Sequence, residues 1–139
     1  MIKFFLHIFV LFFLSANLFA KSEFVKEGID LYKKNKFEDA KFKFEQDIVF
    51  NPKSELSYLY LSKIFNKQDK KNLEEKNLNT VMLLNPKNEE AIYNLARLKL
   101  TSSDYKESKK LNKRLKSICS YFCNKSDQLK IEIENLSKK

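Results

Sequence analysis

The sequence of 139 residues contains one glycine, two prolines, one histidine and no tryptophan. So few glycines and prolines argue against a β-sandwich or β-barrel, whose tight turns need these residues. The histidine, His7, lies in an apolar N-terminal segment, so the rest of the chain lacks the side chain that activates serine and cysteine nucleophiles. A glycine-rich loop for phosphate is absent as well. We therefore expect neither an enzyme nor a cofactor.

Residues 1–20 have the pattern of a secretory signal peptide. Lys3 forms a short positive region, residues 4–14 are apolar except for His7, and the small residue Ala20 ends the segment. Cleavage after Ala20 leaves residues 21–139 as one domain in the periplasm or outside the cell. The alternative is an uncleaved membrane anchor, although the apolar stretch is marginal for crossing about 30 Å of hydrocarbon.

Two Asn-Pro pairs, Asn51-Pro52 and Asn85-Pro86, lie 34 residues apart and each follows an apolar run. A fixed period in this range indicates stacked helical repeats. Proline disfavours helical backbone in the preceding residue, so each asparagine should end a helix. Ser54 and Asn88 should then act as N-caps of the following helices.

Hydrophobic periodicity predicts an all-α chain. Asn35 should occupy a turn, because asparagine tolerates positive φ better than most residues. Asp104 should begin a helix as its N-cap. The last helix has a polar outer face, as the closing helix of a repeat array requires. The expected helices cover about residues 22–34, 37–50, 54–66, 73–84, 88–100, 105–118 and 126–137.

With these helix pairs in hand, the chain resembles tetratricopeptide repeat proteins over residues 22–119. The resemblance implies a helix-turn-helix repeat solenoid of about three repeats with a C-terminal capping helix. Lys71 and Glu74 depart from the pattern, because the family usually has an aromatic residue and alanine at these places. The matching residues are Gly28, Phe37, Ala40, Phe44 and Pro52 in the first repeat, Tyr58, Leu61, Ser62, Phe65 and Pro86 in the second, and Leu95, Ala96, Tyr105 and Ser108 in the third.

The resemblance also implies a ligand groove on the inner faces of the first helices of the repeats. The alternative for the apolar members of this groove is ordinary packing between repeats. Some relatives hold a terminal carboxylate with lysine, asparagine and arginine side chains, but most of the matching places here carry other residue types, so this function is not expected. The candidate groove residues are Tyr32, Leu59, Lys63, Tyr93 and Arg97.

Positive charge is concentrated between Lys99 and Lys125, where eight basic residues stand against two acidic ones. One interpretation is a solvated helix face. The other is a surface for an acidic protein partner or an anionic membrane; nucleic acid is not expected. The candidate basic patch consists of Lys106, Lys109, Lys110, Lys113, Arg114 and Lys116.

Cys119 and Cys123 are the two cysteines of the chain. In an oxidising compartment, cysteines this close are expected to form a disulfide. A catalytic thiol pair is the alternative, but the Cys-x-x-Cys spacing is missing.

These observations leave two expectations for function. The first is an exported scaffold that binds a protein or peptide partner in the cell envelope. The second is a small structural or membrane-surface protein that acts through the basic patch, with membrane contact through that patch or an uncleaved N-terminus.

Overall fold

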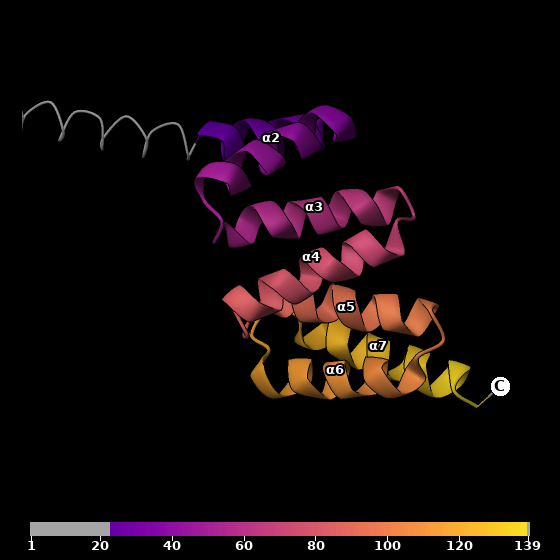
Figure 1. Ribbon diagram of the computed structural model, residues 1–139. Helices are drawn as coiled ribbons and strands as arrows, with labels where there is room; N and C mark the ends of the chain where they lie inside the picture. Colours follow the sequence, from indigo (N-terminus) through magenta and orange to yellow (C-terminus); the bar gives the residue numbers. More distant parts are fainter. Residues whose placement is uncertain (1–22, 139) are drawn as a thin grey trace, which may run out of the picture. The chain divides into compact units, whose positions relative to one another are not determined.

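The computed structural model describes residues 23–138, and their regular structure is entirely helical (Figure 1). The predicted signal peptide, residues 1–20, lies outside this range. The all-α prediction is confirmed, with α4 and α7 beginning two and three residues earlier than expected. The helices are one through residues 23–33, α2 (Phe37–Phe50), α3 (Glu55–Lys67), α4 (Lys71–Leu84), α5 (Glu89–Thr101), α6 (Tyr105–Ile118) and α7 (Cys123–Leu136).

Four helix ends follow the predicted signals. Asn51 and Asn85 are the C-caps of α2 and α4, as the Asn-Pro pairs predicted. The Asn88 side chain accepts a hydrogen bond from the Ala91 N–H at 2.7 Å, and Asp104 accepts one from the Glu107 N–H at 3.1 Å. Both residues are therefore N-caps.

The turns within the helix pairs also repeat with the 34-residue period. Asn35, Asp69 and Ser103 have φ values of 58°, 52° and 62°, and consecutive members of this set are 34 residues apart. A positive φ reverses the chain after a helix and is tolerated by short polar side chains. The third repeat therefore keeps the register although it lacks a final proline.

The chain divides into two compact units, one up to Tyr60 and one from Leu61 onward, so that α3 runs through the boundary. Within residues 23–138, no helix combines the length and apolar character that crossing a bilayer requires.

Close packing in the N-terminal unit depends on Gly28. Phe44 of α2 is 0% exposed, and its ring stacks on Tyr60 with 5.1 Å between ring centroids. A Cβ atom at Gly28 would lie 2.7 Å from Phe44 Cε1, closer than carbon atoms approach. The lack of a side chain at Gly28 thus lets the first two helices meet around the ring.

A buried polar chain also holds the N-terminal unit together. Ser54 Oγ donates to Ser57 Oγ at 3.1 Å, and Ser57 Oγ donates to Asp47 Oδ2 at 2.5 Å. All three residues are buried. The hydroxyl of Ser57 thereby gives one oxygen of the buried Asp47 carboxylate a hydrogen-bond partner in place of water.

In the C-terminal unit, helices α5, α6 and α7 pack together around aliphatic side chains such as Ile92, Leu115 and Leu129 (Figure 1). Ser108 Oγ of α6 donates to the Ala96 carbonyl of α5 at 2.8 Å. A small residue at this position lets the two helices approach closely.

Candidate protein-interaction surface

One face of α5 carries the candidate surface. Glu90, Tyr93 and Arg97 are spaced three and four residues apart, which places them on one side of the helix. Tyr93 is half-buried and Arg97 is exposed. Two of the predicted groove residues are therefore neighbours on an accessible face.

Arg97 is held over the Tyr93 ring. Arg97 Nη1 donates to the Tyr93 hydroxyl oxygen at 3.4 Å, and the guanidinium carbon lies 5.9 Å from the ring centroid. Arg97 Nη1 also lies 3.8 Å from Glu132 Oε2 of α7, and both side chains are 46% exposed. The hydrogen bond with Tyr93 raises the pKa of Arg97 above its ordinary value. The arginine is thus a fixed cation that remains open to solvent.

A second aromatic ring and a second cation complete this surface. The Phe122 ring lies 5.5 Å from the Tyr93 ring between centroids. Lys125 Nζ lies 4.3 Å from the Phe122 centroid and 5.4 Å from the Tyr93 centroid, which are cation–π distances. We call Tyr93, Arg97, Phe122, Lys125 and Glu132 the aromatic–cationic cluster.

The other candidate groove residues take different places. Lys63 pairs with Glu90 at 2.8 Å, one turn before Tyr93 on the same face of α5. Tyr32 belongs to the N-terminal unit, where its ring contacts Tyr60 edge-on at 5.2 Å. Leu59 is 5% exposed, so its side chain belongs to the core and offers little area to a ligand.

Sequence reasoning did not place Phe122 or Lys125 at this surface. The last helix was expected to begin at residue 126, but α7 begins at Cys123. Lys125 and Glu132 are seven residues apart, which puts them on one face of a helix that includes both. Phe122 precedes α7 and gave no periodic signal, because it comes from an irregular turn.

That turn is held by Glu89, the first residue of α5. The backbone N–H groups of Ser120, Tyr121 and Phe122 donate to the Glu89 carboxylate at 2.7, 3.0 and 2.8 Å. Burial alone would raise the pKa of Glu89, but these three hydrogen bonds outweigh it, and the pKa is lowered. The turn therefore keeps Phe122 against Tyr93 and leaves Tyr121 92% exposed.

Cys119 and Cys123 flank the same turn. Their sulfur atoms lie 2.06 Å apart, the distance of a disulfide bond. Among the described residues, no group of three His, Cys, Asp or Glu side chains could hold a metal ion. The geometry of the cysteines thus suits a structural crosslink across the turn.

The basic patch lies on the exposed side of α6, opposite the buried Leu111 and Leu115. Its members differ in their contacts. Lys110 pairs with Glu107 at 3.2 Å, Lys116 pairs with Asp127 at 2.7 Å, and Arg114 donates to the Pro86 carbonyl at 2.5 Å. Part of the patch therefore serves the fold itself.

Glu74 of α4 is 4% exposed, although a charged residue here departs from the repeat pattern. Burial raises the pKa of Glu74. This effect outweighs two that lower the pKa: the Asn66 amide donates to both carboxylate oxygens at 3.1 Å, and Lys71 lies nearby. A raised folded-state pKa contributes stability that is present below the unfolded-state pKa and is lost as the pH rises through the folded-state pKa. Ionised Glu74 is thus a cost at neutral pH.

We expect Glu74→Gln to raise the free energy of unfolding at pH 7 by roughly 0.5–2 kcal/mol. The glutamine carbonyl still accepts from Asn66, and no charge is buried. The gain over the natural protein should shrink below the unfolded-state pKa, where Glu74 is protonated in both states. Urea unfolding at pH 7 and at a pH below the unfolded-state pKa of Glu74 measures this difference. The control is Glu75→Gln, which removes the 2.6 Å ion pair with Lys99 and should not stabilise the protein. A gain in stability from Glu74→Gln that does not depend on pH would contradict the argument.

No family model and no curated protein matches the sequence. Solved structures do match. The TPR2B domain of yeast Sti1, solved as a complex with pHsp70, has a TM-score of 0.79 at 14% identity and covers 85% of this chain and 98% of its own. The Arabidopsis OM64 TPR domain has a TM-score of 0.75 at 20% identity, covering 88% and 98%. The Yersinia enterocolitica chaperone SycD, solved with a peptide of the translocator YopD, has a TM-score of 0.75 at 15% identity, covering 85% and 94%. The chain therefore has the tetratricopeptide repeat fold.

Proposed function

We propose that this tetratricopeptide repeat chain is a scaffold that binds a segment of a protein partner at the aromatic–cationic cluster. The observation that carries the proposal is the pairing of Tyr93 and Arg97 on an accessible face of α5. Tyrosine and arginine are favoured interface anchors because each combines apolar area with a polar tip. Two of the similar structures were solved with a bound partner, Sti1 with pHsp70 and SycD with a YopD peptide, which supports the same use of the fold here.

The cluster suits a segment with at least one carboxylate. Arg97 and Lys125 both present cations over the two tilted rings of Tyr93 and Phe122, whereas Glu132 is the acidic member of the cluster. A ligand carboxylate would compete with Glu132 for Arg97, since their 3.8 Å separation is long for a tight pair. The cations would then set orientation, and the rings would supply contact area.

The cell envelope is the compartment we propose. Two features support it: the signal-peptide pattern of residues 1–20, and the cysteine pair at bonding distance. Disulfides persist in oxidising compartments such as the periplasm.

Tyr93→Ala and Arg97→Ala should each weaken partner binding by more than about 1 kcal/mol, as hot-spot truncations do. Thermal stability should change little in Arg97→Ala, because Arg97 is exposed, and no more in Tyr93→Ala than in Tyr105→Ala, because both tyrosines are half-buried. The partner is first captured from envelope extract by the natural protein, and its affinity for each variant is then measured by calorimetry. Tyr105→Ala and Lys106→Ala on α6 are the matched controls outside the cluster. If both cluster variants bind the partner as tightly as the natural protein does, the proposal is wrong.

The alternative function is attachment to an anionic surface through the basic patch. The observation that favours it is that Lys106, Lys109 and Lys113 are exposed and make no ion pair with the described residues. Salt separates the two functions, because exposed charges are screened while apolar contacts persist. Partner binding at the cluster should survive moderate salt, and binding through the patch should weaken steeply.

A further inference from the structure

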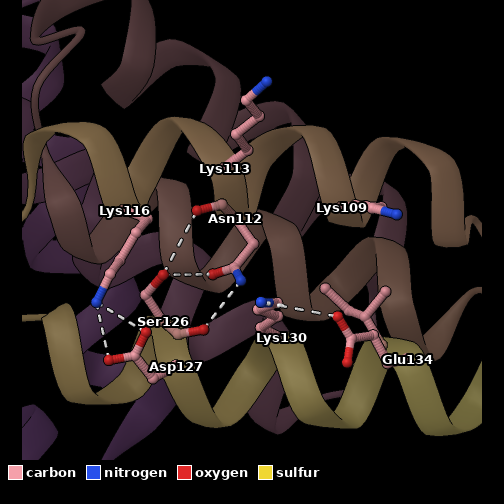
Figure 2. A pocket seen from close by; sticks show the side chains of 9 residues that line it. Lys109, Asn112, Lys113, Lys116, Ser126, Asp127, Lys130 and Glu134 are labelled. Carbon is pink, nitrogen blue, oxygen red and sulfur yellow. Dashed lines mark hydrogen bonds and ion pairs between the residues drawn. The ribbon is translucent and has the colours of Figure 1, made fainter.

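Helices α6 and α7 line a partly open pocket of about 290 Å³, close to the lower limit for small ligand sites (Figure 2). No part of the aromatic–cationic cluster lines it. The lining residues are Lys109, Asn112, Lys113, Lys116, Ser126, Asp127, Lys130, Ile133 and Glu134.

The pocket and the cluster lie on opposite sides of α7. Asp127, Lys130 and Glu134 are spaced three and four residues apart and share one face of the helix. Lys125 and Glu132 share another face, rotated by roughly half a turn, because each helical residue advances about 100°. A ligand in the pocket would therefore leave the cluster free.

The rim of the pocket carries an excess of positive charge: four lysines stand against two carboxylates. Lys116 Nζ lies 2.7 Å from Asp127 Oδ1, and Lys130 Nζ lies 3.9 Å from Glu134 Oε1. Lys109 and Lys113 make no ion pair within residues 23–138. Figure 2 shows the Lys113 ammonium directed away from both pairs. Two cations are thus left for an external anion.

The interior of the pocket offers mostly carbon. Ile133 lines the pocket but is only 3% exposed, so the aliphatic stems of the lysines supply most of its apolar surface. Asn112 and Ser126 satisfy each other: Asn112 Nδ2 donates to the Ser126 carbonyl, and Ser126 Oγ donates to Asn112 Oδ1, both at 2.9 Å (Figure 2). The pocket therefore combines apolar walls with a cationic rim.

We infer that this pocket binds an acidic segment of a protein partner, in which carboxylate side chains flank an apolar one. The apolar side chain enters between α6 and α7 over Ile133, and the carboxylates meet Lys109 and Lys113. The inference is independent of binding at the aromatic–cationic cluster, because it concerns other residues on the far side of α7, and it shares Lys109 and Lys113 with the alternative function of the basic patch.

Charge placement favours a peptide over an anionic bilayer. A bilayer presents an extended negative surface, and membrane-binding patches are clusters of lysines and arginines. Here Asp127 and Glu134 stand in the same rim as the lysines and would be pressed against that negative surface. A peptide can place its carboxylates beside Lys109 and Lys113 and avoid both acids.

The first test uses a blocked synthetic peptide in which glutamate and leucine alternate, added to the isotope-labelled protein. We expect amide shifts around Lys113 and Ile133 and not around Tyr93, with affinity that falls as salt rises. Peptides with glutamine for glutamate, or with serine for leucine, should bind at least about tenfold more weakly. Equal binding of the glutamine peptide overturns the charge requirement, and equal binding of the serine peptide overturns the apolar one.

The second test places the contact. Lys109→Ala/Lys113→Ala should weaken the glutamate–leucine peptide by about tenfold, or 1.4 kcal/mol. Lys106→Ala/Lys110→Ala removes the same charge from the same helix outside the pocket and should change the affinity less than about twofold. Equal losses in the two double variants would show a diffuse charge effect and overturn the site. Binding to phosphatidylglycerol vesicles, with no binding to the peptide, would overturn it in favour of a lipid.

Discussion

Gly28→Val should lower the free energy of unfolding by roughly 1–3 kcal/mol, the usual cost of forcing extra carbon into a packed core. A first added carbon atom would already lie 2.7 Å from Phe44 Cε1. The ring cannot swing aside, because Phe44 is fully buried and stacked on Tyr60. The helix through residues 23–33 must therefore move away from α2. Urea unfolding followed by circular dichroism measures the loss.

Two further variants separate crowding from helix propensity. Asp30→Val introduces the same branched side chain at an exposed position of the same helix and should change stability by less than about 0.5 kcal/mol. Phe44→Leu removes the ring atoms that Gly28 faces, so the Gly28→Val/Phe44→Leu double variant should be more stable than the sum of the single losses predicts. Strict additivity would show that the contact with Phe44 is not the cause.

Asn112→Ala should cost roughly 1–3 kcal/mol, the penalty for leaving buried polar groups without a partner. Asn112 and Ser126 are both buried, and their two hydrogen bonds join α6 to α7. Amide exchange should therefore accelerate first within α7, as the last helix loses its polar attachment.

The matched control for Asn112 is Ser117→Ala on the same helix. Ser117 is exposed and donates only to the Arg114 carbonyl of its own helix, at 2.7 Å, so its loss should be nearly neutral. In a double-mutant cycle, Asn112→Ala and Ser126→Ala should couple by at least about 0.5 kcal/mol. Uniform acceleration of exchange over the whole unit would contradict the view that the pair attaches α7 in particular.

The repeat fold could be predicted because its signals are local. A proline acts on the residue before it, an N-cap asparagine acts within its own first turn, and a helix stripe needs only side chains three and four residues apart. Asn51 and Asn85 accordingly end their helices, and Asn88 caps α5. The starts of α4 and α7 were placed too late. Lys71 and the segment Cys123–Lys125 do not continue the apolar periodicity of the helices that they begin.

The candidate surface could be predicted only in part. Helical spacing placed Tyr93 beside Arg97, because both lie on one helix. It could not separate the buried Leu59 from accessible neighbours, because exposure depends on what packs against a helix. Nor could it show that Glu74 is buried and carries a raised pKa.

The helices, their 34-residue register and the residues that share a face of each helix could be derived from the amino-acid sequence, since these follow from backbone geometry over a few residues. Contacts between helices were decided by the tertiary structure alone. Glu89 reaches three backbone N–H groups more than thirty positions away, and this places Phe122 on Tyr93. Likewise, the pocket exists only where α6 meets α7, because the lining residues of the two helices have no fixed relation until the helices pack.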